Sequence, residues 1–440
     1  MTITTMKTKS TPIVPRFPNP IGIFAALTLS ILTLTCMAAD WPQWRGPQRN
    51  GVSSETGLLK QWPAEGPRLL WQVKDAGKGY AAPAVAGNRL YLLSNEGLED
   101  EFVQAHDVAD GRRLWRTRLG KVGNPNQQPR FPAARSTPTV DGEVLFALGS
   151  DGDLACVETV TGKIRWQKSL REDFGGKPGT WAYAESPLVD GDLLLCTPGG
   201  GDATLVALDK RNGNVLWKCA ISGANEAAYA SAIIVETGGL KQYVQMISGG
   251  LVGVDAKSGR LLWRYDKTVS KYKANIPSPV ARGAWVFSAG AGTGAGTVKL
   301  TMANGNVQAE EVYFGPKLPT AIGGSVLVGD YLYGTSAQGL MCLDFTTGQV
   351  KWENPALGAA SLLHADGHLY LHGENGTVAL VETTPDGYRE KGRFNPPNRP
   401  TRSQPMEKSW AYPVVANGRL YLRDHDILWC YDVKSLTASN

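Results

Sequence analysis

The hydrophobic pattern of residues 134–170 divides into four short β-prone runs separated by turn residues. The first run ends at Asp141-Gly142, a dipeptide typical of two-residue hairpins. Residues 143–148 carry apolar side chains on both faces, which predicts a strand covered on both sides. Residues 163–169 alternate apolar and polar positions, which predicts a half-exposed strand. Because one four-stranded sheet cannot bury two faces alone, this unit needs copies of itself on either side.

The copies share a signature, in which an acidic residue is followed by glycine four positions later and tryptophan four positions after that. The clear copies are Asp107-Gly111-Trp115, Glu158-Gly162-Trp166, Asp209-Gly213-Trp217, Asp255-Gly259-Trp263 and Asp344-Gly348-Trp352. Residues 298–312, 382–387 and 432–436 predict three degenerate copies. Eight copies of roughly 40 residues, with four strands each, predict an all-β fold, an eight-bladed β-propeller.

This repeat resembles the pyrroloquinoline-quinone-like (PQQ-like) β-propeller repeat family, over residues 67–435. The resemblance implies the propeller fold. It leaves the function open, because the family contains both binding proteins and enzymes.

The N-terminal residues predict export. Residues 1–20 contain Lys7, Lys9 and Arg16 but no acid, and residues 21–35 form an uncharged apolar run. Small residues around Cys36 follow at once. This pattern is typical of a secretory signal peptide, and the apolar run is short for a membrane span. The alternative for Cys36 is a lipid-anchor cysteine. We therefore expect a signal peptide at residues 1–38 and an exported chain in the bacterial periplasm or cell envelope.

The net charge of the chain limits the classes of binding partner that we expect. Removing residues 1–38 takes away three positive charges and lowers the formal net charge from +5 to +2. A nearly neutral chain gives no reason to expect nucleic acid or an anionic membrane as partner. No other apolar stretch approaches the length of a transmembrane span, and we expect a monomer.

Five cysteines follow the signal peptide, an odd number. Cys156, Cys342 and Cys430 each stand two residues before the acidic residue of a copy, where other copies have Ala or Gly. Equivalent positions in different blades are too far apart to be bridged. We therefore expect free, buried thiols.

Residues 39–66, which include Trp41 and Trp44, show no strand alternation. They predict a strap that packs over the rim of the propeller. The propeller itself is predicted at residues 67–440. The alternative is that the two tryptophans contact a ligand. Residues 68–74 are typical of an outer strand, with Trp71 at the tryptophan position of the repeat. The last copy lacks such a strand, so the N-terminal strand is predicted to complete the last blade and close the ring.

The loops of a propeller lie on two faces, and the long irregular ones here all fall on the same face, which we call the long-loop face. They are residues 119–135, 171–183, 265–276 and 393–410. The opposite, tight-turn face carries short Gly-containing turns. The candidate binding residues of the long-loop face are Tyr80, Arg135, Trp181, Tyr183, Tyr229, Tyr272, Trp410 and Tyr412. Aromatic residues with an arginine are typical of binding surfaces, although the same rings could instead plug the central channel.

Two classes of function follow from the resemblance. The first is a non-catalytic, cofactor-free propeller similar to the BamB-type outer-membrane assembly propellers, with a protein or glycan partner. The alternative is a quinoprotein dehydrogenase that oxidises alcohols or sugars with pyrroloquinoline quinone and Ca²⁺. Such dehydrogenases carry an adjacent Cys-Cys pair, which this sequence lacks. Asp173, Glu185 and Glu226 are the acids on nearby loops, and none matches a family motif for Ca²⁺. We therefore expect a binding propeller and assign no catalytic, cofactor or metal residue.

Overall fold

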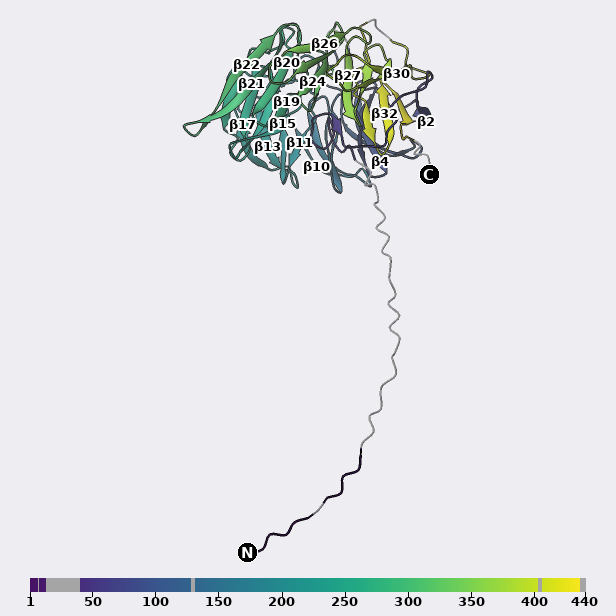
Figure 1. The fold of residues 1–440 in the computed structure, drawn as a ribbon. Helices are drawn as coiled ribbons and strands as arrows, with labels where there is room; N and C mark the ends of the chain where they lie inside the picture. The colour runs from purple at the N-terminus through teal and green to yellow at the C-terminus, as the bar shows by residue number, and fades with distance from the viewer. Residues whose placement is uncertain (7, 13–39, 128–130, 403–405, 436–440) are drawn as a thin grey trace. The chain divides into compact units, whose positions relative to one another are not determined.

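The computed structural model describes residues 1–6, 8–12, 40–127, 131–402 and 406–435. It separates into two compact units, Met1–Met37 and Ala38–Asn440. The second unit holds every strand that the structure describes (Figure 1). Within the described residues, no helix has the length and apolarity needed to span a membrane.

The second unit is an eight-bladed β-propeller, which confirms the predicted fold. In each blade four antiparallel strands follow one another from the inner strand to the outer strand. Blades 1 to 4 are β3 (Ala84–Ala86), β4 (Arg89–Glu96), β5 (Asp100–Asp107) and β6 (Arg113–Gly120); β7 (Thr139–Asp141), β8 (Val144–Leu148), β9 (Asp153–Glu158) and β10 (Ile164–Ser169); β11 (Leu188–Asp190), β12 (Leu193–Cys196), β13 (Leu205–Asp209) and β14 (Val215–Cys219); β15 (Ile233–Thr237), β16 (Leu240–Ile247), β17 (Gly250–Asp255) and β18 (Leu261–Tyr265).

The other four blades complete the ring. Blades 5 to 7 are β19 (Val280–Arg282), β20 (Trp285–Gly290), β21 (Gly294–Ala303) and β22 (Asn306–Gly315); β23 (Ser325–Val328), β24 (Tyr331–Thr335), β25 (Leu340–Asp344) and β26 (Val350–Asn354); β27 (Ala360–Ala365), β28 (His368–Gly373), β29 (Val378–Glu382) and β30 (Glu390–Phe394). Blade 8 is β31 (Val414–Ala416), β32 (Arg419–Asp424), β33 (Ile427–Asp432) and the N-terminal β2 (Arg68–Val73).

Blade 8 is closed by the N-terminal strand, as the sequence predicts. β2 pairs antiparallel with β33, with Arg68 opposite Asp432 and Val73 opposite Leu428. An open propeller would leave the edge of β33 free to pair with another chain. The first strand of the propeller in sequence therefore caps the last.

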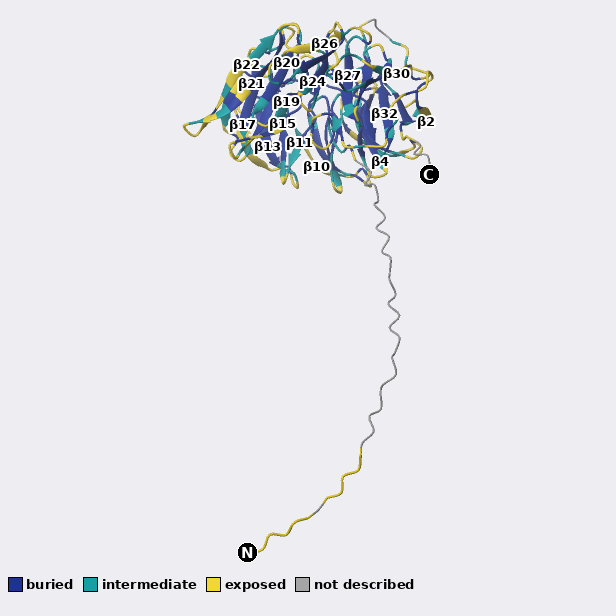
Figure 2. Cartoon of the chain, in the orientation of Figure 1, coloured by how far each residue is buried: buried dark blue, intermediate teal, exposed yellow. Residues whose placement is uncertain are grey.

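The core lies between neighbouring blades. Phe146 of blade 2 and Leu194 of blade 3, for example, belong to one buried cluster. Figure 2 shows the strands mostly buried, with exposure at the turns and loops that join them. Each blade therefore needs its two neighbours to bury both of its faces.

The repeated tryptophan and glycine meet across the boundary between two blades. The indole of Trp217 donates a hydrogen bond to the carbonyl of Ala256 in the next blade, at 3.2 Å. A Cβ atom on Gly259 would lie 2.6 Å from the Trp217 ring, so this position must be glycine. The same bond recurs for Trp71, Trp115, Trp166 and Trp352, and Tyr313 makes it through its hydroxyl in the degenerate blade 5.

The strap is placed differently from the prediction. Residues 41–53 lie at the central channel rather than over the rim, and they contact the inner-strand segment of every blade. The contacts are Trp41 with Val85, Pro42 with Val140, Arg49 with Ser186, Pro187 and Ala232, Trp44 with Ser278, Arg45 with Ser325, Gly51 with His364, and Ser53 with Val415. β1 (Val52–Ser53) also pairs in parallel with β27. The strap therefore plugs the channel on the tight-turn face.

Beyond residue 53 the strap runs outward along blades 7 and 8. Leu59 donates its backbone N–H to Val433 and Trp62 donates to Lys391. The outer strand of blade 7 has Gly392 at the tryptophan position, and the Cβ of Trp62 lies over it. Trp62 packs against Tyr370 and Phe394. The strap thus supplies the ring that the degenerate blade 7 lacks.

The prediction of free, buried cysteines is confirmed for all five that the structure describes: Cys156, Cys196, Cys219, Cys342 and Cys430. Burial raises the pKa of their thiols. Cys36 lies outside the described residues.

The contact between tryptophan and glycine can be tested with two glycines of similar backbone conformation. Gly259 has φ +72° and faces the Trp217 ring, whereas Gly305 has φ +77° and open space where a Cβ would stand. Gly305→Ala should cost only the left-handed strain, about 1–2 kcal/mol. Gly259→Ala adds a clash and should cost at least about 2 kcal/mol more in equilibrium unfolding. Equal costs would show that the tryptophan does not press on this glycine.

The contribution of the strap to stability can be tested at Arg49. Its guanidinium donates to the carbonyls of Ala232 at 2.8 Å, Ser186 at 2.8 Å and Pro187 at 3.1 Å. Arg49→Lys keeps the charge but cannot reach all three, so we expect a loss of about 2–4 kcal/mol in the free energy of unfolding. Arg68→Lys, on a side chain that is 74% exposed, should cost under about 1 kcal/mol and is the control.

Candidate functional site

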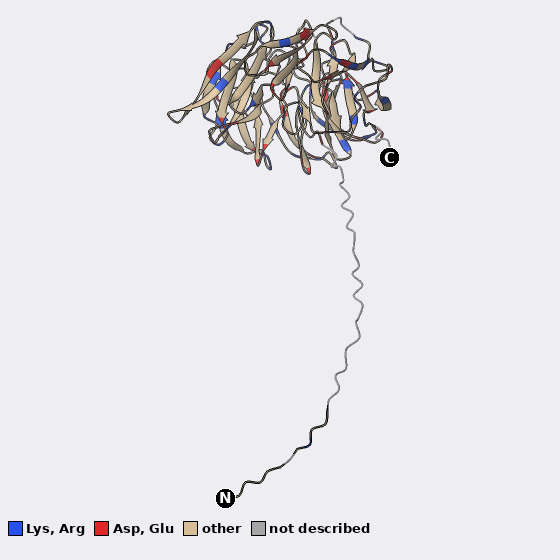
Figure 3. Cartoon of the chain, in the orientation of Figure 1, with Lys and Arg blue, Asp and Glu red and all other residues tan. Residues whose placement is uncertain are grey.

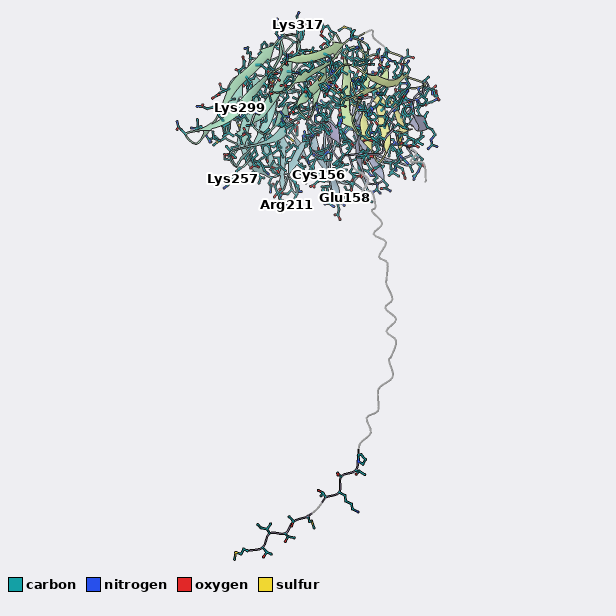
Figure 4. All side chains as sticks on the ribbon, viewed as in Figure 1. Cys156, Glu158, Arg211, Lys257, Lys299 and Lys317 are labelled. Carbon is teal, nitrogen blue, oxygen red and sulfur yellow. The ribbon has the colours of Figure 1, made fainter. Side chains whose placement is uncertain are left out.

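The long connections lie on one face of the propeller because each joins an outer strand to the next inner strand. They link β6 to β7, β10 to β11, β18 to β19 and β30 to β31. Figure 4 shows the two faces at opposite edges, with the turn residues Arg211 and Lys257 below and Lys317, which follows an outer strand, above. Residues 128–130 and 403–405 of the long loops lie outside the described residues.

The long loop at residues 171–183 is hydrogen-bonded to its neighbouring loops. The backbone N–H of Lys177 donates to Pro198 at 3.0 Å, and the carbonyl of Lys177 accepts from Ala227 at 2.8 Å. The side chain of Asn124 donates to the carbonyl of Gly179 at 3.0 Å. This part of the long-loop face is therefore preorganised, which lowers the entropic cost of binding a partner.

Three of the predicted binding residues are buried and hold the loops instead of facing solvent. Tyr183 is 1% exposed and donates its hydroxyl to Pro198 at 2.9 Å. Tyr412 donates to Ile322 at 2.9 Å and packs edge-on against Trp44. The hydroxyl of Tyr229 accepts the backbone N–H of Trp181 at 3.1 Å. These three side chains position the face and present little of their own surface to a partner.

Tyr272 is the exposed aromatic residue among the predicted binding residues, and Trp181 is half-buried, as Tyr80 and Trp410 are. The exposed fraction of Tyr272 is 67%. Trp181 and Tyr272 are each followed by a non-glycine residue in the left-handed region, Ala182 at φ +70° and Lys273 at φ +54°. The reversal at Ala182 lets Tyr183 enter the core while Trp181 stays half-buried. Strain of this kind is found at functional sites.

The remaining predicted residues gather at the mouth of the channel. The rings of Tyr80 and Trp410 are 5.1 Å apart, and Phe131 meets Trp410 edge-on at 5.2 Å. The guanidinium of Arg135 lies 5.3 Å from the Tyr80 ring. It also donates to the carbonyls of Ala133 and Phe131, and burial lowers its pKa. Arg135 therefore anchors its own loop as well as covering Tyr80.

A charged cluster beside this mouth was missed by the sequence reasoning. Arg402 pairs with the buried Asp424 at 2.6 Å, and His425 pairs with Glu407 at 3.2 Å. The His425 ring meets Tyr80 at 5.2 Å, and burial lowers the pKa of His425. The only local signal was Asp-His-Asp at 424–426, at a turn where other blades place glycine or serine.

The acids weighed for Ca²⁺ do not converge. Burial raises the pKa of Glu185 to about 7, and its carboxylate accepts hydrogen bonds from Thr197 and Gln245. Asp173 caps the backbone of Ser169, and Glu226 is exposed. Within the described ranges no three His, Cys, Asp or Glu side chains are placed to hold a metal ion. The donor set therefore does not fit the Ca²⁺ of a quinoprotein.

Comparison with known proteins places the repeat in a family. The sequence matches the family described as outer membrane protein assembly factor BamB over residues 48–124 and 99–354. The chain belongs to this family. BamB of Shewanella oneidensis is 25% identical over 222 residues, which are 50% of this chain and 51% of that protein. The chain spans about half the length of the first BamB relatives it matches.

Solved structures agree with the fold. BamB from Moraxella catarrhalis superposes with a TM-score of 0.58 at 15% identity, covering 80% of this chain and 94% of that one. A quinohemoprotein alcohol dehydrogenase from Pseudomonas putida superposes with a TM-score of 0.53 at 12% identity, covering 91% and 81%. At these identities the BamB and dehydrogenase structures support the propeller fold alone.

Buried carboxyls of the propeller predict a pH dependence of stability. Burial raises the pKa of Glu101 from 4.5 to about 7, against the hydrogen bonds that it accepts from Ser150. The stability contributed by this proton is therefore full below pH 4.5, falls as the pH rises to 7 and is lost above. Glu101→Gln removes the titration. Its free energy of unfolding relative to the parent chain should rise by about 2–3 kcal/mol between pH 4.5 and 7.

Denaturant unfolding at several pH values measures this difference. Glu143→Gln, on a side chain that is 90% exposed, is the control and should show no such gain. Parallel pH profiles for Glu101→Gln and the parent chain would contradict the assignment.

Proposed function

We propose that this chain is an exported, non-catalytic β-propeller that holds a protein partner on its long-loop face in the bacterial envelope. The observation that carries the proposal is the long-loop face, where hydrogen bonds between loops hold the exposed Tyr272 and the half-buried Trp181. Aromatic anchors of this kind supply much of the binding energy in protein interfaces.

The family supports the class of partner. Relatives of this chain are named outer membrane protein assembly factors, so we infer that the partner belongs to the machinery that assembles outer membrane proteins. A protein partner is favoured over a glycan for the same reason. The sequence features of residues 1–38 support the envelope location.

Surface charge supports recognition through shape and aromatic contact. Lys and Arg are interspersed with Asp and Glu along the visible strands (Figure 3). Many of them pair with each other, as Lys241 does with Asp190 and Arg282 with Asp330. A surface of mixed sign gives little long-range steering, so close contacts must provide most of the specificity.

A photocrosslinking amino acid at position 272 tests the proposal in living bacteria. We expect an adduct whose partner, identified by mass spectrometry, is a component of outer membrane assembly. The same crosslinker at position 216, where Leu216 is 53% exposed on an outer strand, is the control and should give no such adduct. Trp181→Ala should weaken capture of that partner about thirtyfold, the effect of losing one anchor.

Two results would contradict the proposal. The first is the same adduct from position 216 and none from position 272. The second is a stoichiometric complex with pyrroloquinoline quinone and Ca²⁺ that oxidises alcohols or sugars, which would establish the quinoprotein alternative.

A further inference from the structure

The hairpin of β21 and β22 in blade 5 is built from two strands of ten residues each, and its tip projects from the edge of the propeller in Figure 1. Asn304 and Gly305 form the two-residue turn, at φ +50° and +77°. Positive φ at both positions is what a type I′ turn requires, and it favours this dipeptide. Both residues are exposed, and nothing lies within 4 Å of where a Cβ on Gly305 would stand. The backbone of the turn therefore has room to rotate.

An asparagine followed by a glycine can react with its own backbone. The glycine nitrogen loses its proton to hydroxide and attacks the side-chain carbon Cγ of the asparagine. A C–N bond forms and closes a cyclic succinimide, while the bond to the amide nitrogen breaks and that nitrogen takes a proton from water and leaves as ammonia. Water then opens the ring at either carbonyl and gives aspartate or isoaspartate. Glycine favours the attack because no side chain hinders its nitrogen.

The sequence contains five Asn-Gly pairs, and in four of them the fold engages the N–H that must react. Gly51 donates its backbone N–H to Arg45 at 2.9 Å, Gly213 to Asp209 at 2.8 Å, Gly376 to Gly373 at 2.7 Å and Gly418 to the carboxylate of Glu55 at 2.9 Å. The N–H of Gly305 makes no hydrogen bond with any residue that the structure describes. It is therefore free to lose its proton to solvent.

The asparagine side chains of the five pairs differ in the same way. Oδ1 of Asn50, Asn212 and Asn375 accepts the backbone N–H two residues further on, at 3.0, 2.9 and 2.9 Å. Oδ1 of Asn417 is buried. The exposed amide of Asn304 has no partner within the described part of the chain. Asn304-Gly305 is thus the pair in which both reacting groups are free.

We propose that Asn304 is a site of spontaneous covalent modification, at which the folded chain loses ammonia and converts this asparagine to aspartate and isoaspartate. The other four pairs are protected by the hydrogen bonds and burial just described. The turn between a third and an outer strand belongs to the tight-turn face. The modification is therefore independent of the protein partner proposed for the long-loop face.

The modification has a structural consequence at the boundary between blades 4 and 5. Aspartate adds only a negative charge to the tip, whereas isoaspartate also lengthens the main chain by one carbon. A two-residue turn fixes the register of its hairpin, so the longer turn disturbs the pairing of Met302 with Val307. Val307 and Leu300 are buried in the cluster that blades 4 and 5 share. Isoaspartate at position 304 therefore loosens this contact.

Peptide mapping of the purified chain by mass spectrometry, over time at mildly alkaline pH, tests the proposal. Trypsin cuts after Lys299 and Lys317, and fragmentation of the peptide between them distinguishes Asn304 from Asn306. We expect Asn304 to convert at least about tenfold faster than the other four asparagines, at a rate proportional to hydroxide concentration. In denaturant the five rates should become similar, because the protecting hydrogen bonds are lost. A rate at Asn304 no higher than the other four, or a tenfold lead that persists in denaturant, overturns the proposal.

Asn304→Gly tests the consequence for the blades. Gly-Gly also supports a type I′ turn and carries no amide to react. After prolonged incubation the parent chain should melt at a lower temperature than before, and Asn304→Gly should keep its melting temperature. Asn375→Gly, at a protected pair, is the matched control and should lose as much on incubation as the parent chain. Equal losses in the parent chain and Asn304→Gly would show that the hairpin tip does not affect the contact between blades 4 and 5.

Discussion

The propeller depends on a contact between blades, in which an aromatic ring of one outer strand lies over a glycine of the next blade and donates a hydrogen bond to its backbone. The indole of Trp115 reaches the carbonyl of Thr159, for example, and its ring covers Gly162. This contact buries apolar area, satisfies the polar N–H of the ring and sets the distance between blades. It requires the acidic turn, the glycine and the tryptophan together, which explains why all three recur at fixed spacing.

The same contact explains how much of the fold could be predicted. A repeat that acts between neighbours is visible as a sequence period, so the blade count, the closing strand and the buried cysteines such as Cys156 followed from the pattern. The placement of the strap did not follow. Arg49 binds Ser186 and Ala232, more than a hundred residues away, and backbone carbonyls leave no signal in a sequence. Trp62 likewise fills a gap in blade 7 that only the assembled ring reveals.

The sequence predicted correctly that the long loops share one face, and it was less informative about which of their side chains are exposed. Loop length identified the face, because long segments cluster where outer strands return to inner ones. It could not show which aromatic side chains point outward. Trp181 and Tyr183 are two residues apart in one loop, and the left-handed backbone at Ala182 separates them, so that Tyr183 is buried and Trp181 is only half-buried. The pairing of Arg402 with Asp424 was also hidden, because it joins a loop to a hairpin turn.

The strap has a consequence for the order in which this chain reaches its native state. Residues 41–53 precede the propeller in sequence, yet their binding sites are distributed over all eight blades, the last of which ends near residue 432. Contacts so distant in sequence form slowly, because the intervening chain must be ordered first. We therefore expect the strap to dock after the blades that it contacts, and the channel is not plugged until it does. β33 likewise keeps an unpaired edge until β2 pairs with it. A chaperone that shields the N-terminal segment during this interval would protect the chain at its most aggregation-prone stage.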